Sequence, residues 1–342
     1  CEKKTRTTPF NPTSRAHIAR ALLDRYQWKP TAFTEKGQVQ VDDDVLQDLP
    51  YPEAKDLATM FTITKRLGQL SEGPKSWLSN VRPDGRISAR AIHNGAVTGR
   101  CTHKIVVNVP KPGVLLGEAF RSLFVAPPGR VLVGVDAKGL DLRGLAHFLA
   151  PFDGGKYTSI VSSGDPHEAN RAAANLETRA KAKEFIYAKL YGAGPGKLGQ
   201  VLGVPEAEAK KISQRFDANL EGYRPLLDNI ADVLVKRGMA TRQEWHGRVY
   251  VKLRAGAFLR GLDGRRLYLR AMHAALNTLI QGASAVLMKR APVTASLAMP
   301  PGVMQVCHQH DEVQYECDPA QAELVGKTAS DAIVEAGEFF KY

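Results

Sequence analysis

The feature of this sequence that most constrains its fold is the position of its strand-like runs. The run VLVGVD ends at Asp136 with a buried-strand pattern, and residues 303–317, VMQVCHQHDEVQYEC, alternate around a polar centre as a β-hairpin with HDE at its turn would. Helical patterns dominate from 138 to 240. A turn and a short strand-like run follow at 261–270, and 273–291 has helical spacing. This order predicts an α+β fold in which β units bracket a long helical insertion.

The segments before Asp136 differ from one another in pattern. Residues 12–80 are mainly helical, with Thr13 or Ser14 as the N-cap of a first helix. From 83 to 135, turns rich in Gly and Pro separate β-rich runs such as KIVVNV. The chain starts with Cys rather than Met and stops straight after a helical pattern. We therefore expect a piece of a longer protein or a processed chain.

Residues 191–199, YGAGPGKLG, match the glycine spacing of a dinucleotide-binding turn. Such a turn must follow a strand, yet the preceding residues 179–192 are rich in Ala, Lys and Glu, with apolar side chains at helical spacing. A Walker loop is also disfavoured, because Tyr191 stands where its first Gly belongs and Leu198 replaces its Ser or Thr. We interpret the glycines as the stop signal of a helix within a helix–turn–helix.

The charge and cysteine content limit the partners and the compartment. The 342 residues carry 47 Lys and Arg against 35 Asp and Glu, a net charge of +12, which favours a nucleic acid, a nucleotide or an anionic surface as partner. Four cysteines without disulfide-like density indicate a reducing compartment, and CTH and CHQH lack the ligand spacing of a zinc site. No apolar run approaches the length of a membrane span, so no membrane partner is expected.

One helical segment carries a stripe of chemically active side chains. Its members recur at every fourth residue and so lie along one side of a helix: Arg179, Lys183, Tyr187 and Tyr191. Such a stripe is either a solvated face or a platform on which cations hold a polyphosphate while a ring stacks on a base or sugar. The spacing alone leaves both interpretations open.

A second helix has hydrogen-bonding side chains at the same spacing, namely His273, Asn277 and Gln281. These side chains are either satisfied by neighbouring loops or form a row of donors against the edges of base pairs. The minor-groove acceptors, purine N3 and pyrimidine O2, occur in every correct pair. A row of donors would therefore sense pairing geometry without reading the base sequence.

Two acids are candidates for holding metal ions. Asp136 directly follows the buried-strand pattern, and Asp311 lies at the tip of the predicted hairpin. Carboxylates on adjacent strands can share two Mg²⁺ ions about 3.5–4 Å apart, an arrangement that activates a hydroxyl nucleophile and stabilises in-line phosphoryl transfer. A single Asp at a strand end is more often a cap or a turn residue. The metal interpretation therefore depends on the pair and on the nearby cationic helix.

Three segments resemble, in order and spacing, motifs A, B and C of the family A, polymerase-I-like DNA polymerases: DAKGLDLR at 136–143, RAKAKEFIYAKLYG at 179–192 and HDE at 310–312. Shorter segments resemble the short-tailed bacteriophage branch of that family, and these are FNPTSR, KRLGQLSEG, NGAVTGR, GDPH, GLDGR and HAALNTLIQGASA. The resemblance covers nearly the whole chain. It implies the C-terminal polymerase portion, without the proofreading exonuclease and most of the thumb.

The resemblance implies a right-hand fold with an antiparallel palm sheet, helical fingers and a partial helical thumb. The base of the thumb would occupy 1–85 and the first part of the palm 86–158. The fingers would occupy 159–272, and the second part of the palm, without its final strand, 273–342. Under this hypothesis the β units that bracket the helical insertion form the palm, and the insertion forms the fingers.

The resemblance also implies roles for single residues. The catalytic metal ligands would be Asp136, Asp311 and the carbonyl of Ala137, with two Mg²⁺ ions as the cofactor. The residues that hold the triphosphate of the incoming dNTP would be Arg179, Lys183 and His167. Lys183 would also donate a proton to pyrophosphate, and Tyr187 would lie near the base and sugar. The residues implied to contact template and primer are Tyr191, Arg100, His273, Asn277, Gln281, His310, Glu312 and Lys65.

The sequence departs from the family pattern at three places. Asp141 stands where the family usually has Glu, at the residue that closes the pocket around the 2′ position of the sugar. The shorter side chain predicts a deoxyribose preference weaker than that of an Asp141→Glu variant. Tyr187 matches the phage type, which predicts tolerance of dideoxynucleotides. The segment 103–111 is shorter than the Asn-Leu-x-x-Ile-Pro stretch of the family, so its template contacts are left open.

The resemblance makes a DNA-directed DNA polymerase the leading hypothesis. The primer 3′-OH would attack the α-phosphate of a dNTP and release pyrophosphate, in phage-type DNA replication in the host cytoplasm. The partners would be primer–template DNA and dNTPs. A processivity factor or other replisome protein would be a further partner, but no segment of this chain identifies its binding site. Two alternatives stay open. One is a catalytically weak nucleic-acid-binding fragment, and the other is a single-subunit RNA polymerase, against which the acid at 141 and the Glu after Asp311 argue.

Overall fold

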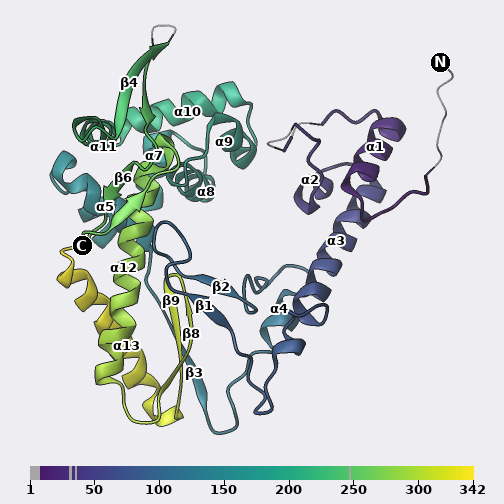
Figure 1. The fold of residues 1–342 in the computed structure, drawn as a ribbon, viewed down its shortest axis with the longest axis vertical. Helices are drawn as coiled ribbons and strands as arrows, with labels where there is room; N and C mark the ends of the chain where they lie inside the picture. Colours follow the sequence, from purple (N-terminus) through teal and green to yellow (C-terminus); the bar gives the residue numbers. More distant parts are fainter. Residues whose placement is uncertain (1–7, 31–32, 35–36, 246–247) are drawn as a thin grey trace. The chain divides into compact units, whose positions relative to one another are not determined.

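The computed structural model describes residues 8–30, 33–34, 37–245 and 248–342, and Figure 1 shows the fold. The chain divides into two compact units. The first unit comprises Cys1–Arg90 and His103–Phe124, and the second comprises Ala91–Thr102 and Val125–Tyr342. The chain passes between the units within two short strands, β1 (Arg90–Ile92) and β2 (Thr102–Lys104), and again after Phe124.

The first unit is helical. Its elements are α1 (Arg15–Tyr26), α2 (Asp43–Gln47), α3 (Pro52–Leu70), η1 (Leu78–Asn80) and α4 (Gly117–Arg121). Ser14 is the N-cap of α1 and its side chain accepts a hydrogen bond from the backbone N–H of His17, as one of the two predicted caps should. Ile18, Leu22 and Leu46 pack in a core between α1, α2 and α3. The predicted helical character of 12–80 is confirmed.

The prediction of a β-strand at KIVVNV is wrong. Only Thr102–Lys104 is extended, and Ile105 and Asn108 have positive φ angles of 74° and 50°. Side chains rather than a neighbouring strand satisfy the backbone here, because the indole of Trp77 donates to the carbonyl of Ile105 at 3.0 Å. Gln69 donates to the carbonyl of Asn108 in the same way at 3.3 Å. Tertiary contacts therefore override the β-propensity of the run.

A three-stranded antiparallel sheet forms one half of the second unit. Its strands are β3 (Val131–Asp136), β8 (Met304–Gln309) and β9 (Glu312–Cys317), in the order β3-β9-β8. Residues nearly 180 positions apart thus pair, with Asp136 opposite Glu312. Helices α12 (Ala275–Ala298) and α13 (Ala322–Phe339) lie side by side, and α13 packs against the sheet (Figure 1). The predicted buried strand and the hairpin are both confirmed.

Helix α12 differs in its bounds from the predicted 273–291. A 3₁₀ turn, η2 (Met272–Ala274), precedes it, and the helix continues beyond Pro292 to Ala298. Proline usually ends or kinks a helix because it lacks an N–H group. Here the helix continues because it packs along α13, with Ala291 and Ala295 buried on either side of the proline.

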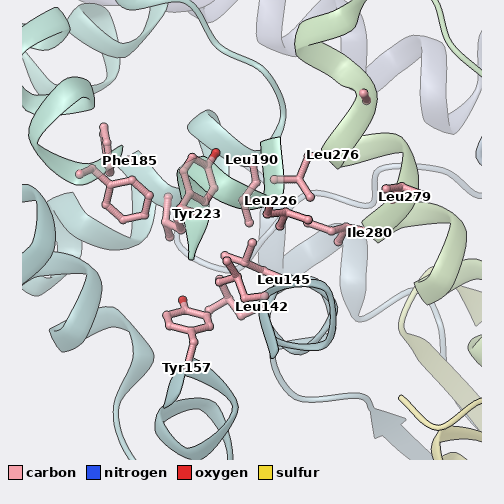
Figure 2. Packing of buried hydrophobic residues seen from close by; sticks show 14 of the residues in the cluster. Leu142, Leu145, Tyr157, Phe185, Leu190, Tyr223, Leu226, Leu276, Leu279 and Ile280 are labelled. Carbon is pink, nitrogen blue, oxygen red and sulfur yellow. The ribbon is translucent and has the colours of Figure 1, made fainter. Parts of the chain in front are cut away.

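Seven helices form the other half of the second unit, as the helical patterns predicted. They are α5 (Leu140–Asp153), α6 (Lys156–Ser163), α7 (Pro166–Ala174), α8 (Arg179–Leu190), α9 (Pro195–Leu202), α10 (Glu206–Asn219) and α11 (Tyr223–Lys236). Figure 2 shows part of their shared core, to which Leu145 of α5, Phe185 of α8 and Leu276 of α12 all belong. This core fixes α8 relative to the start of α12.

Two hairpins follow the helices. The strands β6 (Phe258–Arg260) and β7 (Arg266–Tyr268) confirm the turn and strand predicted at 261–270. The hairpin of β4 (Ala240–Trp245) and β5 (Arg248–Leu253) was not predicted. Strand β4 of this hairpin packs against α11. The position of the hairpin therefore depends on tertiary contacts, which the local sequence pattern does not reveal.

The glycines at 191–199 form a turn between helices. Helix α8 ends at Leu190, Gly192 has a φ of +81°, and α9 begins at Pro195 with Gly194 as its N-cap. A Cβ at Gly192 would come within 3.0 Å of the ring of His273, so the close approach also requires glycine. The helix–turn–helix prediction is confirmed, because the element directly before the glycines is the helix α8.

A nearly buried ion pair anchors α8 from behind. The Nζ of Lys189 lies 2.6 Å from an oxygen of Asp217 on α10, and the two side chains are 10% and 15% exposed. The same ammonium donates to Ser213 at 2.8 Å and lies over the rings of Phe216 and Tyr223. The pair therefore joins α8 to α10 and α11.

We expect Asp217→Ala to lower the free energy of unfolding by about 3 kcal/mol, because it leaves a cation nearly buried without its partner. The paired replacement Lys189→Met with Asp217→Leu should restore most of the loss. Urea unfolding measures both effects. The matched control is Asp331→Ala, which removes an exposed partner of Lys327 and should cost less than about 1 kcal/mol. Equal losses for Asp217 and Asp331 would contradict the role of the buried pair.

Candidate active site

The end of β3 brings two acids together. Asp136 is the last residue of β3 and pairs with Glu312, the first residue of β9. The backbone N–H of Ala137 donates to the carbonyl of Asp311 at 2.9 Å. His310 has a φ of +59° in the tight turn between β8 and β9, which places Asp311 directly beside the end of β3. The residues proposed from sequence as a metal-binding pair are therefore neighbours across the β3–β9 ladder.

The electrostatics of this edge fit a cation. Burial first, and then the charges of Asp311 and Glu312, raise the pKa of the Asp136 carboxyl. Carboxylates that repel one another in this way are stabilised by a bound divalent ion. The described residues hold no group of three or more His, Cys, Asp or Glu side chains arranged around one point. Two carboxylates with water and substrate oxygens suit Mg²⁺, which keeps much of its hydration shell in proteins.

The cations at the start of α8 lie beside α7. Thr178 caps α8, and Arg179 donates to Asp165 through Nε at 2.6 Å and Nη2 at 3.2 Å. Asp165 is itself the N-cap of α7, and the hydrogen bond from Arg179 lowers its pKa to about 2. Burial, and then the charges of Arg179 and Lys183, lower the pKa of His167. Arg179, Lys183 and His167 are thus close enough to act on one anion.

Tyr187 connects this cationic group to the sheet edge. Its ring centroid lies 6.1 Å from that of His167. Burial raises the pKa of the Tyr187 phenol, and the charges of Asp141, Asp311 and Asp136 raise it further. The rings of Tyr187 and Tyr191 lie 6.4 Å apart, and the Tyr191 hydroxyl donates to Asp141 at 2.8 Å, so the aromatic end of the stripe reaches the start of α5. Its role as a platform for a nucleotide stays a prediction.

Asp141 gathers side chains from three segments. The residue Asp141 is 9% exposed. Its carboxylate accepts hydrogen bonds from Arg100 at 2.8 Å and from Tyr191 at 2.8 Å. Ser284 of α12 lies 3.2 Å from the same carboxylate. Burial and the charge of Asp141 raise the pKa of Tyr191 to about 12. Tyr191, at the end of the α8 stripe, is thereby tied to the start of α5.

The predicted row of donors occupies the first turns of α12 and the 3₁₀ turn before it. His273 is exposed, and Asn277 and Gln281 are partly exposed. Within the described part of the chain, the amide groups of Asn277 and Gln281 have no hydrogen-bonding partner. Burial, and then the charge of Arg100, lower the pKa of His310. The row is thus available to a ligand rather than consumed by neighbouring loops.

Sequence reasoning placed most of these residues but not all of their partners. The second unit brings together all the predicted site residues except Lys65, which lies on α3 of the first unit. Glu312 accepts a hydrogen bond from Gln314 at 2.7 Å. Asp165 and Ser284 were missed as partners of Arg179 and Asp141. Asp165 could have been noticed because Asp before Pro is a frequent helix N-cap, whereas nothing in the sequence marks Ser284.

The fold has a close counterpart among solved structures. The POL domain of Pol1 from M. smegmatis, solved in complex with DNA primer-template and dNTP, superposes with a TM-score of 0.76 over 95% of this chain and 58% of that chain, at 22% sequence identity. This likeness confirms the α+β right-hand fold expected from the sequence.

The sequence itself fixes the family. The family model for DNA polymerase family A matches residues 2–339, and the chain belongs to that family. It is 37% identical over 97% of its length to the DNA-directed DNA polymerases of Escherichia phage T7 and Enterobacteria phage T3. Identity to the thermostable DNA polymerase I of Thermus aquaticus is 27% over 95% of the chain. The resemblance stated from the motifs is confirmed.

The chain spans 50% of the length of these phage relatives and 39% of the Thermus enzyme. Members of the family generally use divalent metal ions. Over the residues that the structure describes, no helix combines the length and the apolar character needed to cross a membrane. The boundaries of palm, fingers and thumb within the two compact units stay predictions.

Proposed function

We propose that this chain is the catalytic part of a template-directed DNA polymerase that replicates phage DNA in the host cytoplasm. The observation that carries the proposal is the position of Tyr187. Its ring lies 6.1 Å from that of His167 and 6.4 Å from that of Tyr191, whose hydroxyl bonds Asp141, five residues after Asp136. One site thus offers a place for a triphosphate next to a place for metal. The phage relatives named as DNA-directed DNA polymerases support the same reaction.

The reaction joins the primer 3′-OH to the α-phosphate of a dNTP and releases pyrophosphate. Asp136, Asp311 and the Ala137 carbonyl would hold two Mg²⁺ ions. When bound, the ions lower the pKa of the primer hydroxyl and stabilise charge on the phosphorus oxygens in an in-line displacement. Two carboxylates on one rigid ladder suit this task because the sheet fixes their separation.

The helix α8 would bind and protonate the leaving group. Arg179, Lys183 and His167 would hold the triphosphate, and Arg179 keeps donors for it because Asp165 engages only Nε and Nη2. Lys183 is exposed and close to His167, and it would donate a proton to pyrophosphate as the P–O bond breaks. Tyr187 would pack against the base and sugar.

The remaining exposed polar groups would hold primer and template. The residues proposed for these contacts are Tyr191, Arg100, His273, Asn277, Gln281, His310, Glu312 and Lys65. The amides of α12 would lie along the minor groove, where correct pairs present the same acceptors. A processivity factor or another replisome protein would be a further partner, bound through surfaces other than these site residues.

Primer extension tests the proposal and its alternatives together. The chain is incubated with Mg²⁺, a primed template and either dNTPs or rNTPs. Extension with dNTPs is the expected result. Binding of primer–template without extension would favour a catalytically weak nucleic-acid-binding fragment, and preferential use of rNTPs would favour a single-subunit RNA polymerase.

A further inference from the structure

The carboxylate of Asp141 is held from several sides in a nearly closed space. Arg100 donates to Oδ1 at 2.8 Å and Tyr191 donates to Oδ2 at 2.8 Å. The hydroxyl of Ser284 lies 3.2 Å from Oδ1, and Ser284 is 1% exposed. Oδ1 therefore sits between a guanidinium and a hydroxyl that belong to different segments of the chain.

The proton of Ser284 has one best acceptor. The hydroxyl is also 3.0 Å from the carbonyl of Ile280, one turn earlier in α12. The oxygen of Tyr342 is a third acceptor beside it, while Tyr342 donates its own proton to the carbonyl of Leu140 at 3.0 Å. A serine hydroxyl carries a single proton, and the carboxylate of Asp141 is the charged acceptor of the three, so it forms the strongest bond. Ser284 thus links α12 to the start of α5 through Asp141.

The space around Oδ1 suits the length of Asp141. An additional methylene would push the carboxylate toward Ser284 or Arg100, both already at hydrogen-bonding distance. Because both partners of Oδ1 are already in place, a longer acid must displace one of them to keep its hydrogen bonds. Removing the Ser284 hydroxyl would open space on the side of α12.

We propose that Ser284 is a positioning residue that seats Asp141, and that the two side chains are matched in length. The proposal rests on the proposed polymerase function. Through Asp141 it acts on Arg100, a primer–template residue, and on Tyr191, at the end of the α8 stripe. The identity of residue 284 therefore determines which carboxylate length at 141 gives an efficient site.

A double-mutant cycle in single-nucleotide incorporation tests the match. Ser284→Ala should lower kcat/KM for dNTPs about tenfold, because a charge-assisted hydrogen bond is lost. Asp141→Glu should lower it by a similar factor of about ten through overpacking. The double variant should recover to within about threefold of the unmodified protein, since the lost hydroxyl makes room for the longer acid. The ratio of dNTP to rNTP efficiency, measured on the same proteins, tests the expected gain in sugar selectivity with Asp141→Glu.

The control is Thr278→Val combined with Asp141→Glu. Thr278 is a buried residue of the same helix whose hydroxyl bonds the carbonyl one turn earlier at 2.8 Å, as Ser284 also does. Its hydroxyl does not contact Asp141, so this pair should show no recovery. Recovery with Thr278→Val, or simple addition of the effects of Ser284→Ala and Asp141→Glu, would overturn the proposal.

Thermal unfolding separates the failure of this inference from failure of the proposed function. A chain that extends no primer would refute the function alone. The match would then be judged from melting: each single variant should unfold about 2–4 °C lower, and the double variant should regain the loss. Additive lowering in the double variant would overturn the match whatever the activity.

Discussion

Asp136→Asn should reduce primer extension by at least about 1,000-fold, because the variant loses several kcal/mol of charge stabilisation in the transition state. The fold should survive the change. The pKa of Asp136 is raised by burial and by the charges of Asp311 and Glu312, so the charged form is a cost in the metal-free protein. The free energy of unfolding should therefore stay equal or rise slightly, within about 0.5 kcal/mol.

The contrast between activity and stability makes this test specific. A variant that is inactive because it is misfolded would unfold at lower urea concentration, whereas the account predicts an inactive and fully folded protein. Asp331→Asn is the matched control, because Asp331 is an exposed acid of α13 that pairs with Lys327. It should extend primers at the normal rate. Full activity of Asp136→Asn would refute the assignment of the metal pair.

Lys183→Arg should lower kcat at least about 100-fold while KM for dNTP changes less than about threefold. Arginine keeps the positive charge that binds the triphosphate, but its pKa is too high for it to release a proton to pyrophosphate. Lys183→Ala should raise KM as well, because it removes the charge. Rapid-quench incorporation of one nucleotide separates the two constants.

Lys181→Arg is the control for this experiment. Lys181 lies on α8 two residues before Lys183 and pairs with Glu177 at 3.0 Å. It is not on the stripe, so the change should leave both constants unchanged. If Lys183→Arg keeps its kcat, the proton reaches pyrophosphate from another group, and Lys183 only binds.

Local patterns predicted the elements that carry the site. The strand ending at Asp136, the hairpin at Asp311 and the helix beginning at Arg179 all depend on periodicity, turn residues or caps, which lie close together in sequence. For the same reason the glycines after Tyr191 were recognised as the end of a helix rather than a nucleotide-binding loop. The residues themselves suggested Asp136 and Asp311 as a metal-binding pair, but the family resemblance was needed to favour that pairing over two separate turn residues, because pairing between distant strands leaves no local mark.

The errors and omissions share one physical cause. The KIVVNV run is not a strand because side chains such as Trp77 bind its carbonyls. Helix α12 runs past Pro292 because α13 supports it. Ser284 was missed because a serine within a helix usually bonds its own backbone, and only the fold brings Asp141 to it. Each depends on tertiary contacts between segments far apart in sequence.

Counting bound divalent ions tests the central claim most directly. Mn²⁺ is titrated by electron paramagnetic resonance into the chain with a dideoxy-terminated primer–template and the next dNTP, and into the variant carrying both Asp136→Asn and Asp311→Asn. The account predicts about two tightly bound ions in the unmodified complex. It predicts their loss in the variant. Equal ion binding by both proteins would show that these two acids do not form the metal site.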